Sequence, residues 1–425
     1  MRDSIDTDKD YDVAIVGASL AGCATAIFLA RSGARVALVE KQPDAAAFKR
    51  VCSHYVQPSA GPTLDRLGML EPMLRAGAVR SRIRVWTPWG WIAAPRGVDV
   101  GSGINLRREK LDPLIRGIAA STAGVEPILG NAVQGLLRTD GETRGVLLSN
   151  PRGGQTELRA RLVVGADGRN STVARLAGIR ARVSSNGRFT YGGYFEGGLP
   201  DHAPDGSLWL MDPQTASAFP TDAGLTLYAC MLTKEHLSAF RGHPAEALVS
   251  YVERLPDPPP IRDARLIGRV WGKLEMPNLV RKPIAPGLAL VGDAALAADP
   301  LAGVGCGWAL RSAEWLASSI GPAITGTEPL NTGLRRYRRT HARAIGAHAL
   351  IIRDYATGRK TRASERLVLS AAARNQLVAR EFEALFSGTV GPARFLAATV
   401  PLATVVNVRH IIAGRKRAGE PAGAS

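Results

Sequence analysis

The sequence predicts a mixed α/β protein of 425 residues with a strand-rich insertion and a helical C-terminal region. Three observations predict this class. Short apolar runs lead through glycine turns into helices at three places before residue 321, which is typical of parallel α/β units. Alternating strand-like runs fill residues 189–273, and helical patterns dominate after residue 330.

The first α/β unit lies near the N-terminus. Residues 12–17 form a short run rich in β-branched side chains, which predicts a buried parallel strand. The small apolar residues 23–30 predict a helix, and residues 35–40 predict a second strand that ends on Glu40. Between the first strand and the helix stands the turn Gly17-Ala18-Ser19-Leu20-Ala21-Gly22.

This order of elements predicts a Rossmann-type dinucleotide site. Gly17 suits the tight turn, Gly22 suits close packing of the helix on the strand, and a pyrophosphate would lie at the positive N-terminus of the helix. Glu40 can accept hydrogen bonds from the ribose hydroxyls, and it disfavours a ribose 2′-phosphate. Ser19 replaces the usual middle glycine, and its hydroxyl can bond a phosphate oxygen. The expected contacts are Gly17, Ser19, Leu20, Ala21, Gly22 and Glu40.

Two further strand–turn motifs follow. Residues 161–165 predict a strand that leads into Asp167-Gly168, with a helix beginning near Ser171. Residues 287–291 predict a strand that ends in Gly292-Asp293 and continues through the glycine-rich stretch 299–307 into a helix over 308–320. Bare N–H groups at such a helix start favour an anionic ligand.

These three motifs together, over residues 12–320, resemble those of FAD-dependent oxidoreductases of the aromatic-hydroxylase (group A flavin monooxygenase) and geranylgeranyl-reductase type. The resemblance implies FAD as cofactor and NAD(P)H as reductant. It implies that Asp293 holds a ribityl hydroxyl, that Asp167 supports the pyrophosphate region and the reductant, and that Arg108 contacts the flavin cofactor. Taken alone, Arg108 would be a surface charge and Asp167 a turn or cap residue.

The same resemblance implies a turn beside the isoalloxazine ring. Pro300, Gly303 and Gly305 would form this turn, and its backbone N–H groups would stabilise negative charge on reduced flavin. Residues 48–55 resemble a Lys-x-Cys-Gly stretch that approaches the ring, with Arg50 and Ser53 as departures.

The catalytic candidates are therefore Cys52, His54 and Pro300, none of them certain, because the flavin carries the chemistry. A structural cysteine and an ordinary loop histidine stay open as alternatives.

The inserted region predicts a second domain. Residues 82–92 predict a hairpin, and the runs within 189–273 predict an antiparallel sheet that the resemblance places over the flavin. Alternation puts about half of the aromatic and sulfur side chains in the sheet's own core. Candidate pocket residues are Tyr191, Tyr194, Trp209, Met211 and Phe219. The expected domains are 1–80, 100–185 and 280–330 for FAD, 81–99 and 186–279 for substrate, and a helical, basic region over 331–425.

Three reactions fit this resemblance. A monooxygenase would use NAD(P)H and O₂ to hydroxylate or epoxidise a hydrophobic small molecule, either aromatic, polyketide or isoprenoid. A reductase would saturate a carbon–carbon double bond, but Ser53 and Thr221 depart from the reductase pattern. A halogenase is least favoured, because Trp89-Gly-Trp91-Ile92 only partly matches its signature. The monooxygenase is therefore the preferred hypothesis. A binding protein without catalysis is disfavoured by the three intact acidic residues of the FAD motifs.

Composition excludes several further classes of protein. The four cysteines are scattered, so neither a disulfide framework nor a metal site is expected, and the polar, acidic residues 1–10 do not suit a signal peptide. A cytoplasmic enzyme is expected.

Charge is concentrated in the last quarter of the chain. The formal net charge is +17, and residues 331–425 hold 17 Lys/Arg against 5 Asp/Glu. Arginine-rich helices with a solvated face explain this concentration of positive charge better than a nucleic-acid binding site does. We therefore do not expect nucleic acid as a partner. The apolar run 395–406 contains Pro401 and is shorter than the roughly 18 residues of a membrane span. We therefore expect no membrane-spanning helix. Peripheral membrane contact through the basic C-terminus is the alternative to a region that is simply solvated. The oligomeric state stays open.

Overall fold

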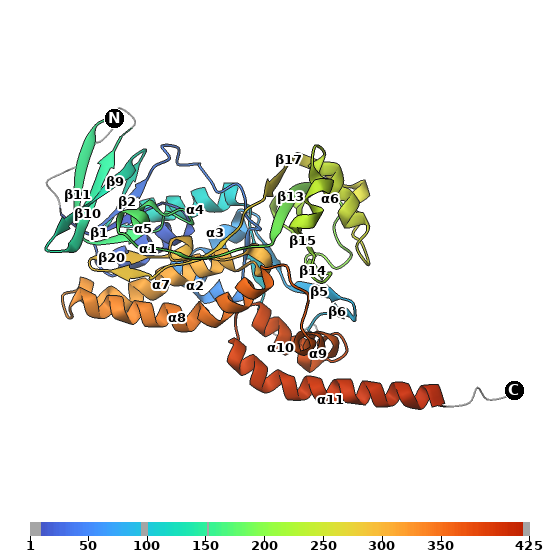
Figure 1. The fold of residues 1–425 in the computed structure, drawn as a ribbon. Helices are drawn as coiled ribbons and strands as arrows, with labels where there is room; N and C mark the ends of the chain where they lie inside the picture. The colour runs from blue at the N-terminus through green and yellow to red at the C-terminus, as the bar shows by residue number, and fades with distance from the viewer. Residues whose placement is uncertain (1–9, 95–100, 151–152, 420–425) are drawn as a thin grey trace. The chain divides into compact units, whose positions relative to one another are not determined.

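The computed structural model describes residues 10–94, 101–150 and 153–419, and it divides into two compact units (Figure 1). The first unit comprises Met1–Ala78, Leu106–Asn186 and Met276–Arg353, and the second comprises Val79–Asn105, Gly187–Glu275 and Asp354–Ser425. The sequence predicts one region over residues 331–425. The structure instead divides them, because the long helix that begins at Leu330 packs in the first unit and the later helices belong to the second.

The first unit is built on an eight-stranded sheet. Its main path runs β19-β20-β11-β1-β2-β8, and β10 and β9 continue from β11. The pairs that surround β1 are parallel, as the predicted α/β units require. The strands are β1 (Tyr11–Val16), β2 (Val36–Glu40), β8 (Val125–Leu129), β9 (Ala132–Thr139), β10 (Glu142–Ser149), β11 (Gln155–Gly165), β19 (Ile284–Ala285) and β20 (Leu288–Leu290).

Helices surround this sheet. α1 packs against α7 and α4, and α8 runs alongside α7 in Figure 1. The helices of this unit are α1 (Leu20–Arg31), α2 (Gly61–Leu67), α3 (Leu70–Arg75), α4 (Arg108–Ser121), α5 (Thr172–Leu176), α7 (Val304–Ile324) and α8 (Leu330–Tyr355). A small sheet of β12 (Arg182–Ser184), β18 (Asn278–Val280) and β21 (Leu296–Ala297) and the short strand β3 (Tyr55–Val56) complete it.

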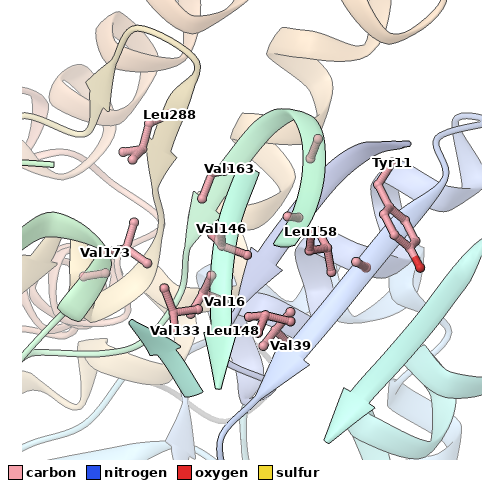
Figure 2. Close-up of a cluster of buried hydrophobic side chains, with 14 of the residues drawn as sticks. Tyr11, Val16, Val39, Val133, Val146, Leu148, Leu158, Val163, Val173 and Leu288 are labelled. Carbon is pink, nitrogen blue, oxygen red and sulfur yellow. The ribbon is translucent and has the colours of Figure 1, made fainter. Parts of the chain in front are cut away.

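The core of the first unit lies on the sheet. Figure 2 shows the side chains of several strands meeting there, among them Val16 from β1, Val39 from β2 and Val163 from β11, all almost fully buried. These strands are apolar on consecutive residues because both faces of a parallel sheet are covered. The predicted strand–helix–strand unit is therefore confirmed as β1, α1 and β2. α7 begins at Val304, earlier than expected, because Gly303 adopts a positive φ of 61° and caps it.

The second unit contains a seven-stranded sheet of order β17-β13-β16-β15-β14-β5-β6. The hairpin predicted over 82–92 is confirmed, since β5 and β6 pair antiparallel around residues 87–90. The predicted antiparallel sheet needs one correction, because β14 pairs with β5 in parallel. β5 comes from a separate segment, so no tight turn fixes its direction relative to β14. The strands are β5 (Ile83–Thr87), β6 (Gly90–Ile92), β13 (Arg188–Glu196), β14 (Gly206–Leu210), β15 (Thr215–Pro220), β16 (Leu225–Thr233) and β17 (Arg265–Lys273).

One face of this sheet carries α6 (Pro244–Glu253) and an aromatic core. Trp209 is almost fully buried and donates its indole N–H to the carbonyl of Pro256, at 2.8 Å. Tyr191 stacks on Phe240 with ring centroids 4.9 Å apart, and Met211 packs against the same cluster. These three pocket candidates therefore contribute to the core of their own unit. A pair of short strands, β4 (Val79–Ser81) and β7 (Gly103–Asn105), lies in this unit too.

Three helices end the second unit, namely α9 (Ala363–Ala372), α10 (Gln376–Phe386) and α11 (Pro392–Gly419). They pack against one another, and Gly358 after α8 and Gly388 after α10 both have positive φ. The expectation that no helix could span a membrane was wrong in one respect. Pro392–Ile412 is long and apolar enough by length and composition, although such a helix alone is weak evidence. Pro401 does not end the helix, so the run continues past residue 406.

Candidate flavin site

The first glycine turn joins β1 to α1, and packing inside the protein requires both of its glycines. Gly17 has a φ of 105°, and a Cβ there would lie 2.6 Å from the carbonyl oxygen of Ala166. A Cβ on Gly22 would lie 1.7 Å from the carbonyl oxygen of Gly17. Ser19, Leu20 and Ala21 form the start of α1, where N–H groups lack partners within the helix. The turn thus holds backbone donors at a positive helix end.

Glu40 lies at the end of β2, beside this turn. Its Oε2 accepts the N–H of Ala18 at 2.9 Å, and its Oε1 accepts the N–H of Gln42 at 3.0 Å. Each carboxylate oxygen has a second lone pair. Glu40 is therefore fixed by the turn that it serves, and it keeps acceptor capacity for a ribose.

Arg108 begins α4 and is almost fully buried, with an exposed fraction of 3%. Its Nη2 donates to Oγ of Ser19 at 2.7 Å, and its Nε donates to Oδ1 of Asp112 at 2.8 Å. Asp112 is buried as well, so the pair forms an ion pair shielded from water. The surface alternative for Arg108 therefore does not hold, and the guanidinium reaches the serine that replaces the middle glycine.

α4 supports the turn from a second position. Arg116, eight residues after Arg108 on the same helix face, donates from Nε to the carbonyl of Ala18 at 3.1 Å. Its other guanidinium nitrogens bond the carbonyls of Ala45 and Ala47. Arg108, Asp112 and Arg116 therefore form one inward row that fixes the glycine turn.

Asp293 follows β20 and faces Lys49. The Nζ of Lys49 lies 3.2 Å from Oδ2 of Asp293, and the charge of Asp293 raises the pKa of Lys49. The backbone N–H of Lys49 donates to Asp112 at 2.9 Å. The segment 48–55 is thus tied to both the Gly-Asp motif and the arginine row. Lys49, rather than the adjacent Arg50, makes this contact, although both residues are exposed.

Asp167 lies beyond β11, at the start of α5. Its Oδ2 accepts the N–H of Val173 at 3.0 Å, whereas its Oδ1 is buried and has no hydrogen-bond partner. Arg281 links this motif to the Gly-Asp motif by donating to the carbonyls of Arg169 and Ala294, both at 2.9 Å. The cap alternative for Asp167 accounts for only one of its two oxygens, and the other is available to a ligand.

The second glycine turn precedes α7 and is fixed by a buried polar network. Asp299 accepts the N–H of Leu301 at 2.8 Å and the side-chain amide of Asn186 at 2.6 Å. Its own N–H donates to Asn278 at 2.8 Å. Pro300 starts the short 3₁₀ turn Pro300–Ala302, and a Cβ on Gly305 would enter open space. Neither packing nor a positive φ explains the glycine at position 305.

Cys52 and His54 lie beside Arg108. Cys52 is half-buried, its Sγ lies 3.6 Å from Sγ of Cys306, and Nη1 of Arg108 lies 3.7 Å away. His54 is 2% exposed, and its Nδ1 accepts the backbone N–H of Arg108 at 3.2 Å. The hydrogen bond from Cys306, together with those from His54 and the charge of Arg108, holds the pKa of Cys52 well below its usual range despite burial. His54 is therefore a positioning residue for the start of α4.

These residues fit FAD. The glycine turn and Glu40 would hold the pyrophosphate and the adenosine ribose, and Asp293 would hold the ribityl chain. Two features of the structure indicate that a ligand binds here. The buried Oδ1 of Asp167 has no hydrogen-bond partner, and the space at Gly305 is open. No group of His, Cys, Asp and Glu side chains among the described residues is arranged to hold a metal ion.

Sequence reasoning overlooked several residues of this site. Asp112 and Arg116 carried a readable signal, because their spacing of four and eight from Arg108 marks one helix face. Lys49 and Cys306 lie within segments that the sequence marks, but their partners Asp293 and Cys52 are 244 and 254 residues away in sequence, so only the fold reveals these contacts. Asn186 and Asn278 gave no local signal at all.

Comparisons with known proteins agree with this geometry. Residues 10–212 match the FAD binding domain family. Digeranylgeranylglycerophospholipid reductase of Methanosarcina mazei is 27% identical over 309 residues, which cover 69% of this chain and 71% of that protein. The 6-methylpretetramide 4-monooxygenase of Streptomyces rimosus is 33% identical over 175 residues, which cover 40% of this chain and 41% of that protein.

Solved structures share the fold. The flavin-dependent brominase Bmp2 aligns with a TM-score of 0.76 and 18% identity over 96% of this chain and 100% of that one. A p-nitrophenol 4-monooxygenase from Pseudomonas putida aligns with a TM-score of 0.72 and 19% identity over 90% and 99%. Together with the motifs, these findings assign residues 10–212 to the FAD binding domain family and show an FAD-dependent oxidoreductase, whose relatives include proteins named as geranylgeranyl reductases and as a monooxygenase.

Proposed function

We propose that the protein is an FAD-dependent monooxygenase of the cytoplasm that uses NAD(P)H and O₂ to hydroxylate or epoxidise a hydrophobic aromatic, polyketide or isoprenoid molecule. The observation that carries the proposal is the 33% identity to a monooxygenase in one segment of the chain, against 25–27% for the reductases. The halogenase alternative is supported only by fold, since the halogenase structures are at most 20% identical.

The chain's own residues would bind and orient the cofactor. Bound FAD would supply the redox chemistry, taking two electrons from the nicotinamide and activating O₂. Arg108 and the N-terminus of α7 place positive charge in the site, which favours the anionic form of a reduced flavin. His54 is committed through Nδ1 to the backbone of Arg108, so we do not assign it as a general base.

A carbon–carbon double-bond reductase is the second candidate, and one feature favours it. Such a reaction needs a proton donor beside the flavin as well as a hydride, and the Cys52–Cys306 pair lies among the flavin motifs. Seven relatives named as reductases align with 69–81% of this chain. Their longer alignments support shared ancestry over more of the chain at lower identity.

The test is oxygen dependence in the purified, FAD-loaded protein. With candidate substrates, a monooxygenase should consume NAD(P)H and O₂ and incorporate one atom of ¹⁸O₂ into product. A saturated product formed under anaerobic conditions would establish the reductase instead. Halogenated product in the presence of chloride or bromide would establish the halogenase, and either result overturns the proposal.

A further inference from the structure

Two of the four cysteines meet in the first unit although 254 residues separate them in sequence. Cys52 lies in the segment before β3, and Cys306 lies in the first turn of α7. Their sulfur atoms are 3.6 Å apart, in hydrogen-bond contact. A disulfide requires about 2.05 Å, so the sulfurs need to approach by about 1.5 Å. Residues 47–54, outside any helix or strand, can supply this shift more readily than a helix can.

The surroundings distinguish the two sulfurs. Nη1 of Arg108 lies 3.7 Å from Sγ of Cys52 and 4.0 Å from Sγ of Cys306, and Cys52 receives in addition the backbone N–H of His54 at 3.3 Å, so its thiolate is the better stabilised of the two. Cys306 is 5% exposed, and its contact with Cys52 and its burial raise the pKa of its thiol. One partner therefore favours the thiolate while the other stays a thiol. Cys52 is also the more exposed of the two, which admits a small oxidant.

We propose that Cys52 and Cys306 form a peroxide-reactive dithiol within the flavin site, with Cys52 as nucleophile and Cys306 as resolving thiol. The Cys52 thiolate attacks one oxygen of hydrogen peroxide, the O–O bond breaks, and hydroxide leaves while Cys52 becomes a sulfenic acid. The Cys306 sulfur then attacks the Cys52 sulfur, the S–O bond breaks, and water leaves with the Cys306 proton. The hydroxide takes up the proton that Cys52 released on ionising, so two thiols are oxidised to one disulfide and one peroxide is reduced to two waters.

This inference stands whichever reaction the protein catalyses, because it rests on the two cysteines alone. The disulfide would join the segment carrying Lys49 to the start of α7. It would also remove the thiolate that faces Arg108. Peroxide would thereby change two elements that the flavin site uses, so the dithiol can report oxidative conditions to that site.

The test measures oxidation of each cysteine in the full-length, FAD-loaded protein. The protein is treated with increasing hydrogen peroxide, unfolded, alkylated and mapped by mass spectrometry. We expect Cys52 and Cys306 to lose their thiols together, at least about tenfold faster than Cys23 and Cys230, whose pKa values burial raises to about 12. The mapped pair should be linked, lighter by two hydrogen atoms and restored by dithiothreitol.

Variants separate the two roles. Cys306→Ser should leave Cys52 as a sulfenic acid that dimedone traps, whereas Cys52→Ser should leave Cys306 unreacted at the same doses. Cys230→Ala, in β16 of the second unit, is the matched control and should not change the rate of Cys52 oxidation. Equal oxidation of all four cysteines, or Cys52 oxidised without linkage to Cys306, would overturn the proposal.

An independent observation concerns α11, whose outer face is apolar. The inner face is fixed by Phe395, Thr399 and Ala403, all buried, and by Asn407, which donates to the carbonyl of Leu367 in α9 at 2.9 Å. Val405, Val408 and Ile412 recur at spacings of three and four residues and are about half exposed. Only 17% of the apolar stretch Pro392–Ile412 is buried.

Charge indicates what covers this face. From Thr389 to Gly419 the sequence contains five Lys/Arg and no Asp or Glu, with three of the five at 415–417. A helix with exposed aliphatic side chains and cationic residues suits the interface of an anionic bilayer. We therefore infer that α11 lies on an anionic membrane surface through the face of Val405, Val408 and Ile412.

Vesicle sedimentation of the full-length protein tests this inference. Binding should be strong to vesicles containing phosphatidylglycerol, weak to phosphatidylcholine alone, and weakened by salt. The triple variant Val405→Ser/Val408→Ser/Ile412→Ser should bind at least about tenfold less. The matched control Val183→Ser/Leu199→Ser removes exposed aliphatic side chains elsewhere and should bind normally. Resistance to carbonate extraction, or a dimer that the triple variant dissociates, would overturn the inference.

Discussion

The two glycine turns of the flavin site look alike in sequence, but the protein itself requires glycine for different reasons in each. In the first turn, a Cβ on Gly22 would lie 1.7 Å from a backbone oxygen. In the second, Gly303 needs its positive φ, whereas a Cβ on Gly305 would meet nothing within 4 Å. The first turn is thus built by backbone packing, and the second leaves space that the protein does not use. Gly22 is therefore required for folding, whereas a ligand in the neighbouring space would explain Gly305.

The supports behind the two turns differ as well. Two arginines of α4 bond the first turn at Ser19 and Ala18. Asp299, with Asn186 and Asn278, fixes the second. The first support is ionic and contains one buried carboxylate, Asp112, whereas the second consists of one carboxylate and two amides. Removing the support should therefore lower the free energy of unfolding by different amounts at the two turns.

Gly22→Ala should have the largest effect. The added Cβ meets the backbone of Gly17, which cannot move without separating β1 from α1, so we expect a loss of more than about 4 kcal/mol in the free energy of unfolding. Soluble yield and thermal unfolding measure it. Gly117→Ala, on the exposed side of α4 with nothing within 4 Å, is the control and should be neutral or stabilising by up to about 1 kcal/mol. A well-folded Gly22→Ala protein would contradict the packing account.

Arg108→Met should have the second-largest effect on stability. It leaves the buried Asp112 carboxylate without its cation, which costs about 3–5 kcal/mol, measured by urea unfolding of the FAD-free protein. Asp112→Asn in the same chain removes the stranded charge and keeps an acceptor for the N–H of Lys49, so the double variant should recover much of the loss. If the double variant is no more stable than Arg108→Met, the ion pair is not what supports the first turn.

Acid should weaken the region behind the second turn. Tyr337 of α8 donates to the carbonyl of Leu290, at the end of β20, and His341 lies one helical turn further on. Burial lowers the pKa of His341 to about 4. The unfolded chain therefore binds the proton first as the pH falls below about 6.5, and stability decreases toward pH 4.

The expected size follows from these two pKa values. Between pH 8 and pH 5 this histidine should remove about 2 kcal/mol, which thermal unfolding across that range would detect. His341→Phe keeps a ring against Trp315 and Tyr337 and should flatten this part of the pH profile. An unchanged profile in the variant would show that other groups govern acid stability.

The contrast between the turns explains how much the sequence could predict. The strands that precede the three motifs and the positions of Glu40, Asp167 and Asp293 follow from local patterns, since each of these acids stands directly beside a strand end. The partners of Arg108 do not, because Ser19, Cys52 and Cys306 come from three distant segments that only the folded sheet brings together. Pairing of β14 with β5 and continuation of α11 through Pro401 were unpredicted for the same reason, since packing rather than local preference decides them.

Gly305→Ala has the smallest expected effect and tests the comparison most sharply. Because a Cβ at 305 meets no protein atom and lies in the first turn of α7, the FAD-free variant should unfold within about 0.5 kcal/mol of the parent. FAD affinity, measured by quenching of flavin fluorescence, should nevertheless fall about tenfold, which corresponds to about 1.4 kcal/mol. Gly321→Ala in the same helix also enters open space, so it should leave FAD affinity unchanged and should be neutral or stabilising by up to about 1 kcal/mol. If Gly305→Ala binds FAD as the parent does, the open space at the second turn is not a cofactor surface, and position 305 has no explanation in either packing or binding.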